Sequence, residues 1–268
     1  MSAARKYILV IGFACAAGWS DVICFRRYQS FAALMTGNTV KAGIASATQT
    51  EKDFDRWLDV VYYISILLSY IAGGVIFEAV KARKPNKAGM ILAPCCLALN
   101  VLSDVLFKLS DVDDLKATRW QVCLLSPTFG IQNSLSFGGS MAVNTTIITG
   151  NSQKMSQCLY QLCSGKLTTD KAKSFVPPLL TILSTLLAAC AGAFVLMDVS
   201  GMDASWLFLP SGVLQAVMMC LHDYVLVGVE PARKGLTPSL NNTAEISISS
   251  APEAKAAESN EALAAQKV

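Results

Sequence analysis

Two short polar patterns recur in a chain that is otherwise rich in apolar residues. Asp21 is followed by Thr36-Gly37-Asn38, and Asn133 is followed at nearly the same distance by Thr149-Gly150-Asn151. Glycine allows a positive φ or a close backbone approach, while Thr and Asn side chains can pair with peptide groups that a broken helix leaves unsatisfied. Where such a break lines a cavity in a membrane, the same groups can coordinate an ion or a polar solute. The two patterns therefore predict either a solute pathway or a pair of helix caps at the membrane interface.

Asp21 lies within the first long apolar segment, where a charged carboxylate is costly. Insertion scales assign about 3 kcal/mol to Asp at the centre of a membrane helix, so it should face a cavity or pair with Arg26 or Arg27. The neutral Asn133, next to Gln132, holds the corresponding place in the second pattern. We hypothesise that Asp21 couples transport to protons; uptake that stayed pH-dependent in an Asp21→Asn variant would contradict this. The predicted pathway comprises Asp21, Gln132, Asn133 and both Thr-Gly-Asn motifs.

A second group of polar residues lies in the later apolar segments. Asn100 and Asp104 are one helical turn apart, and His222-Asp223 lies near the end of the last segment. His222 is the only histidine, so a metal site or a catalytic triad would lack partners. The sequence contains no phosphate loop, zincin helix or nucleophile elbow. We predict no enzyme, no metal and no cofactor, and treat Asn100 and Asp104 as a secondary polar cluster.

Long apolar segments must position these residues. Hydrophobic residues make up 53% of the 268 residues and charged ones 15%, and the mean hydropathy is +0.45, which favours lipid as the solvent. Windows near the roughly 20 residues needed to cross hydrocarbon occur at Tyr7–Phe25, Trp57–Val80, Ala88–Phe107, Gln121–Val143, Phe175–Met197 and Trp206–Val229. The sequence thus predicts an all-α membrane protein with six transmembrane helices.

The ends and the charge of the chain complete this organisation. After residue 229 the composition becomes polar and proline-containing, which predicts a disordered cytoplasmic tail at 230–268 behind a transmembrane domain at 1–229. A net charge of +3 without a basic cluster argues against nucleic acid as a partner. The predicted partner is the lipid bilayer, and homo-oligomerisation is left open. Most of the nine cysteines lie in apolar runs, as buried free thiols do.

Basic residues predict the orientation in the membrane. They are in excess on the side that holds both termini, so both termini are predicted to be cytoplasmic. Arg5 and Lys6 before an apolar stretch also fit a cleavable signal peptide. The first segment has an internal counterpart in the second half of the chain, and this favours a retained helix.

The polar patterns divide the chain into two related halves, at about 7–107 and 121–229. Because each half holds three predicted spans, the second must begin on the opposite side of the membrane, so the halves are inverted. Several residues, Gly18, Asp21, the Met-Thr-Gly-Asn-Thr stretch at 35–39, Gly130 to Asn133 and Asn144-Thr145-Thr146, together resemble the YoaK-type family of multi-pass membrane proteins. That resemblance implies a shared membrane fold, and the family is a domain of unknown function. The polar stretch between Gln153 and Ser174 and the charged tail depart from it.

Two classes of function fit these patterns. A secondary transporter or channel for a small polar solute or ion would use the paired motifs as its pathway. A non-transporting scaffold or assembly subunit would use the same polar residues only to hold helices together. Motifs that meet at one cavity at mid-depth favour transport, whereas motifs at opposite headgroup regions with a dry centre favour the scaffold.

Overall fold

The computed structural model describes most of the first 227 residues. The described residues are 3–47, 53–110, 118–138, 141, 143–146, 148–164, 168–198 and 206–227. Contacts divide the chain into Met1–Glu230 and Pro231–Val268, and all described residues belong to the first unit. The predicted tail at 230–268 lies outside the described residues.

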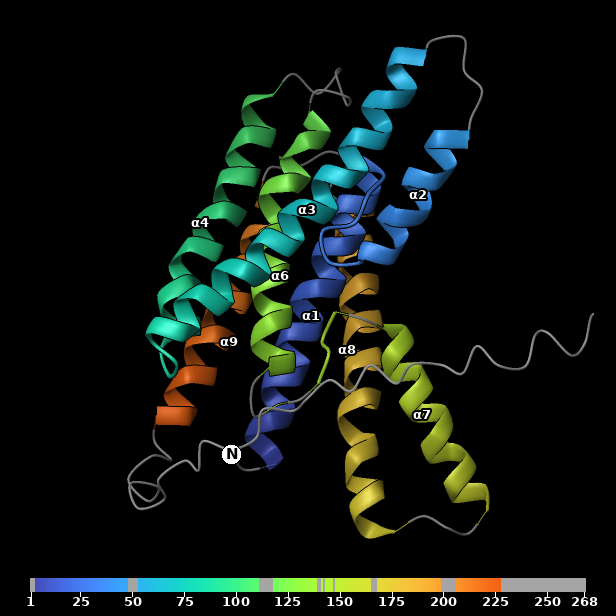
Figure 1. The fold of residues 1–268 in the computed structure, drawn as a ribbon, viewed down its shortest axis with the longest axis vertical. Coiled ribbons are helices and arrows are strands. Elements are labelled where there is room, and N and C mark those ends of the chain that lie inside the picture. The colour runs from blue at the N-terminus through green and yellow to red at the C-terminus, as the bar shows by residue number, and fades with distance from the viewer. Residues whose placement is uncertain are drawn as a thin grey trace, which may run out of the picture. The chain divides into compact units, whose positions relative to one another are not determined.

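The described part of the chain forms helices and no strand (Figure 1). In chain order they are α1 (Ala3–Tyr28), α2 (Met35–Ala47), α3 (Asp53–Arg83), α4 (Ala88–Leu109), the 3-10 helix η1 (Arg119–Gln121), α6 (Val122–Gly138), α7 (Ile148–Cys163), α8 (Thr169–Asp198) and α9 (Leu209–Val227). The all-helical prediction is confirmed. Each of the six predicted spans overlaps a helix, and two further helices, α2 and α7, lie between the predicted spans.

Among the residues that the structure describes, four helices are long and apolar enough to cross a membrane. They are α1, α3, α4 and α8. The other two predicted spans coincide with α6 and α9, which are shorter helices of 17 and 19 residues. Only 28% of the apolar window of α3 and 17% of that of α8 is buried, against 61% for α1. Broad exposed apolar faces on α3 and α8 are what a lipid-facing helix presents, so α1 is the central helix and these two are peripheral.

The chain turns back into the bundle after α1. Gln29, which follows the last residue of α1, has a φ of 53°, the left-handed conformation that commonly ends a helix. The backbone N–H of Ala33 then donates to Asp21 Oδ1 at 2.8 Å. Asp21 precedes the last residue of α1 by two turns, so Ala33 lies about 10 Å back along its axis. The helix α2 therefore begins inside the bundle.

A similar return follows α6. The hydroxyl of Thr146 donates to Asn133 Oδ1 at 3.2 Å, and Asn133 lies more than one turn before the last residue of α6, Gly138. The helix α7 then begins at Ile148 and packs along α8, as α2 packs along α3. Both short helices thus start within the bundle rather than at its end.

The two Thr-Gly-Asn motifs lie in the first turns of α2 and α7. Thr36 to Asn38 and Thr149 to Asn151 are helical, and neither glycine has a positive φ, so neither glycine acts as a turn residue. A Cβ at Gly37 would lie 2.7 Å from the ring of Phe31, so this glycine permits a close approach. No atom lies within 4 Å of the corresponding point at Gly150.

Close backbone contacts join α1 to α8 and α3 to α6. A Cβ at Gly18 would overlap the carbonyl group of Thr185, and a Cβ at Gly130 would overlap that of Tyr70. Small residues at such crossings let helices approach where lipid supplies no hydrophobic force between them. These glycines therefore fix two of the main helix pairs of the bundle.

The substitution Gly130→Ala is expected to lower the free energy of unfolding by about 1–3 kcal/mol, the usual cost of overpacking. Gly43 on α2 supplies the control, because no atom lies within 4 Å of its added Cβ. Gly43→Ala should be neutral or slightly stabilising, since alanine favours a helix over glycine. Unfolding in mixed SDS micelles measures both variants, and equal effects would contradict the close α3–α6 crossing.

Candidate functional site

The asparagine of each motif braces the segment that leads into its helix. Asn38 Nδ2 donates to the carbonyl oxygen of Phe31 at 2.7 Å, and the Phe31 N–H donates back to Asn38 Oδ1 at 3.0 Å. Asn151 Nδ2 donates to the carbonyl oxygen of Asn144, also at 2.7 Å. Both asparagines are buried. They satisfy peptide groups that the returning chain would otherwise leave unpaired in an apolar surrounding.

Asp21 and Asn133 fasten these returning segments to the long helices. Asp21 accepts from Ala33, and Asn133 accepts from Thr146. The predicted alternatives were a pair with Arg26 or with Arg27, and the Arg27 guanidinium lies 3.8 Å from Oδ1 of another carboxylate, Asp104. Asp21 therefore stands behind the segment that precedes α2 and holds it in place.

The first turns of α2 and α7 meet at one cavity of about 550 Å³. Among the predicted pathway residues, Thr36, Gly37, Asn133 and Thr149 line it. The remaining lining residues are Phe25, Phe31, Ala33, Leu34, Met35, Val40, Lys41, Ile44 and Tyr70. The walls are thus mostly apolar, with polar side chains from α2, α3, α6 and α7. Cavities that bind small molecules commonly have this composition.

Lys41 is the one charged side chain among the described residues that line this cavity. Its Nζ donates to the carbonyl oxygen of Gln29 and lies 4.9 Å from the centre of the Phe25 ring. Tyr70, which the sequence reasoning missed, lies with its hydroxyl 3.4 Å from Thr146 Oγ1. The only sequence feature that could have indicated Tyr70 as a cavity residue was its hydroxyl group within the apolar window at 57–80.

Gln132 belongs to a buried network rather than to the cavity. Its Nε2 donates to the carbonyl oxygen of Phe13 at 3.0 Å, and Gln215 Nε2 donates to Gln132 Oε1 at 3.0 Å. Gln215 also donates to the carbonyl oxygen of Thr128 at 3.0 Å. All these polar side chains are buried. The network joins α1, α6 and α9, and Gln215, an isolated polar residue in an apolar window, was the missed member.

The predicted pair Asn100 and Asp104 separates into two environments. Asp104 Oδ2 accepts from the backbone N–H of Phe208 at 2.9 Å and from that of Leu209 at 2.8 Å, which caps the first turn of α9. Asn100 Nδ2 instead donates within its own helix to the carbonyl oxygen of Cys96 at 2.9 Å. A Cβ at Gly212 would lie 2.6 Å from Asn100 Cβ, so Asn100 marks a close approach of α4 and α9.

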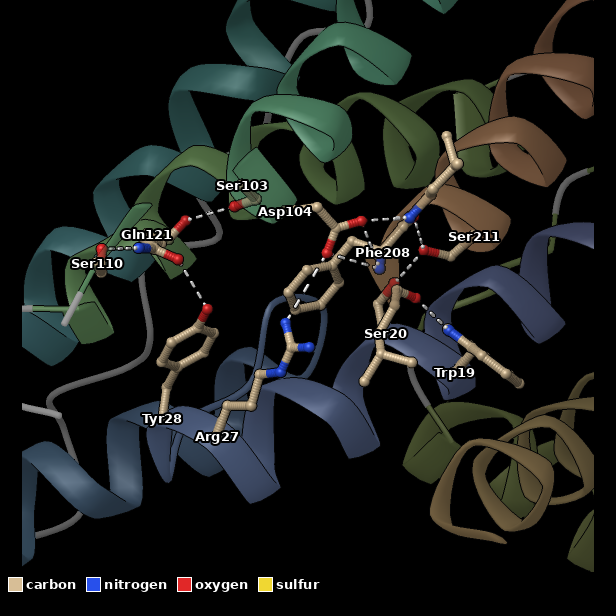
Figure 2. A network of polar contacts seen from close by, with 12 residues as sticks. Trp19, Ser20, Arg27, Tyr28, Ser103, Asp104, Ser110, Gln121, Phe208 and Ser211 are labelled. Carbon is tan, nitrogen blue, oxygen red and sulfur yellow. Dashed lines mark hydrogen bonds and ion pairs between the residues drawn. The ribbon is translucent and has the colours of Figure 1, made fainter. Parts of the chain in front are cut away.

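Asp104 lies at the centre of a polar network (Figure 2). Beside it, the hydroxyl of Ser20 donates to Ser211 Oγ at 2.8 Å, and Trp19 Nε1 donates to the carbonyl oxygen of Leu207 at 2.7 Å. Each bond runs from α1 to the start of α9 or to the residues just before it. The network therefore holds the beginning of α9 against α1 and α4.

Asp223 of α9 caps the first turn of α4. The backbone N–H of Met90 donates to Asp223 Oδ2 at 2.8 Å, so the carboxylate of α9 caps α4 as the carboxylate of α4 caps α9. His222 Nδ1 lies 3.0 Å from Asp223 Oδ1, and both residues are buried. The two helices thus exchange carboxylate caps, an arrangement that sequence spacing alone did not indicate.

The substitution Asp104→Asn is expected to lower the free energy of unfolding by about 1–2 kcal/mol, because the amide keeps one acceptor oxygen but the bonds to two backbone donors lose their charge assistance. Asp59→Asn is the matched control. Asp59 pairs with Arg119 and is partly exposed, and pairs of that kind contribute about 0–1 kcal/mol. Thermal unfolding in detergent compares the two variants, and an Asp104→Asn effect no larger than the control would contradict the cap.

Residues 9–220 match the family described as "Protein of unknown function (DUF1275)". The match covers both polar patterns, the cavity between α2 and α7 and the Asp104 cap of α9, and it ends before Asp223. Comparisons with curated proteins and with solved structures gave no significant match.

Proposed function

The chain belongs to the DUF1275 family, and from this premise we propose that it is a secondary transporter or channel for a small polar solute or ion. The observation that carries the proposal is the cavity where the first turns of α2 and α7 meet. Thr36 reaches it from one half of the chain and Thr149 from the other. Transporters place discontinuous helices around a solute site near the middle of the membrane in this way. The narrower resemblance to the YoaK-type proteins rests on the same motifs.

Matching contacts support two inverted repeats. In the first half Asn38 bonds to Phe31 and Asp21 to Ala33; in the second half Asn151 bonds to Asn144 and Asn133 to Thr146. The helix pairs match as well: α1 packs on α8 as α6 packs on α3, and α4 and α9 exchange caps. Each half thus contributes three helices at the predicted spans and one further helix, α2 or α7.

The relative direction of α1 and α6 supports the inversion. Tyr28, the last residue of α1, donates through its hydroxyl to Gln121 Oε1 at 2.8 Å, and Gln121 immediately precedes α6. The end of α1 therefore meets the start of α6, so the two helices are antiparallel. Each of the helices α2 and α7 starts inside the bundle and runs outward in the same direction as the helix before it, α1 or α6. The two short helices therefore run to opposite ends of the bundle (Figure 1).

This arrangement gives the proposed topology. Six crossings by α1, α3, α4, α6, α8 and α9 leave both termini on the cytoplasmic side, where basic residues are in excess. The short helices α2 and α7 enter from opposite faces without crossing. The described residues of both lead-in segments are hydrogen-bonded, and Phe31, Ala33 and Leu34 before α2 line the cavity, which lets non-helical backbone lie at depth.

The charge of the cavity narrows the class of solute. Lys41 is its charged side chain among the described lining residues, and Asp21 lies behind the wall rather than in it. The N-terminal turns of α2 and α7 add partial positive charge. These features favour a neutral polar solute or an anion over a cation.

The experiment that tests the proposal is solute-dependent thermal stabilisation of the purified protein across a panel of small polar metabolites and anions. A solute that binds the native state at 100 times its dissociation constant adds about 2.7 kcal/mol to the apparent stability. We expect at least one solute to stabilise the wild-type chain, and flux of that solute into proteoliposomes to follow. Binding without flux would favour the scaffold, whose buried Gln132–Gln215 network only holds helices together.

A further inference from the structure

A second cavity, of about 530 Å³, lies between the first turns of α1, the middle of α7 and the first part of α8. Three lysines line it, one from each helix: Lys6, Lys154 and Lys173. None of its described lining residues is acidic. Lysines that share one cavity favour a bound anion there.

The uncharged lining residues indicate what kind of anion fits. Gln161 lines the same cavity, and its Oε1 is buried without a hydrogen-bond partner. Because that oxygen is closed to solvent, a hydroxyl group of the ligand would instead bond to the exposed amide of Gln157, which also lines the cavity. Tyr7 and Pro177 give the cavity an apolar side. The ligand that fits carries a compact anion, at least one hydroxyl and, beside them, apolar surface.

We propose that this cavity binds a phosphate group that bears or neighbours a hydroxyl. Lysine suits phosphate as a point charge with several donors. The cavity lies at the end of α1 that holds the N-terminus, beyond most of its apolar window, where the headgroups of a bilayer would lie. Basic pockets between membrane helices bind anionic lipid headgroups on this principle. The site shares no lining residue with the cavity of the proposed function and does not depend on transport.

The test measures the unfolding temperature of the full-length protein in neutral detergent against three probes. They are inorganic phosphate, phosphatidylglycerol in mixed micelles, and phosphatidylcholine at the same mole fraction, with sodium chloride matching ionic strength. Stabilisation by phosphate and phosphatidylglycerol assigns the site to phosphate from any source, and stabilisation by phosphatidylglycerol alone assigns it to a lipid headgroup. Equal shifts with phosphatidylcholine, or no shift with any probe, overturn the proposal.

Substitutions of the three lysines test whether the stabilisation arises from binding at this cavity. The triple substitution K6Q/K154Q/K173Q is expected to weaken binding on the order of 100-fold, since each lysine near an anionic surface contributes severalfold. The control K81Q/K84Q/K87Q removes the same charge outside the cavity and should retain binding. If the triple variant fails to fold, Lys154→Gln alone, at an exposed position on α7, should weaken binding roughly fivefold. An equal loss in the control set would also overturn the proposal.

Discussion

Solute flux into proteoliposomes that contain the Thr149→Trp variant is expected to fall to that of empty liposomes, while the protein remains folded. Thr149 lies in the first turn of α7, is exposed, and lines the cavity opposite Thr36 and Gly37 of α2. An indole there projects into a space of about 550 Å³ whose walls already include the rings of Phe25, Phe31 and Tyr70. The side chain makes no bond on which the described fold depends, so loss of flux should not accompany loss of stability.

The matched control for this experiment is Ser156→Trp. Ser156 lies on the same helix and is exposed, but it lines neither of the two cavities described above. Flux through Ser156→Trp should equal that of the wild-type protein, and both variants should unfold at temperatures close to the wild-type value. Wild-type flux through Thr149→Trp would show that the solute does not pass the cavity, and the transport proposal would then lose its carrying observation.

The likeness of the structures around Thr36 and Thr149 could be predicted from the sequence, because two similar polar patterns in an apolar chain indicate two similar local structures. The positions of the long helices could be predicted for a related reason. Apolar windows of bilayer length have few alternatives to a helix, since every peptide group must be paired within its own segment. The four long apolar helices and the helical class follow from the apolar windows, whereas the sequence left open whether the two motifs meet at a cavity.

The short helices α2 and α7 could not be predicted from apolar length, because they are 13 and 16 residues long and carry polar side chains. Their identity as helices depends on tertiary bonds, such as Asp21 with Ala33, that no local pattern contains. The placement of Gln132 in a buried network was missed for the same reason. Its partner Gln215 is on α9, and only the packed bundle brings the two amides together.

Labelling of the two short helices at their outer ends is expected to report opposite compartments. Ala47 ends α2 and Cys163 ends α7, and both are exposed. If the halves are inverted, a membrane-impermeant maleimide added to intact cells should modify Ala47→Cys but not the native Cys163. Permeabilisation should then make Cys163 reactive. Peptide mapping by mass spectrometry identifies each modified site, so the other native cysteines can stay in place.

Lys84→Cys provides the control for sidedness, because Lys84 directly follows α3 and is exposed on the predicted cytoplasmic side. It should behave as Cys163 does and unlike Ala47→Cys. Each short helix ends on the face from which it entered. Labelling of Ala47→Cys and Cys163 from opposite compartments therefore requires an odd number of membrane crossings between these two positions. Labelling of both sites from one face would mean an even number, so the two short helices could not enter from opposite leaflets. The shared cavity would then join helices from one side of the membrane, an arrangement that provides no route across it.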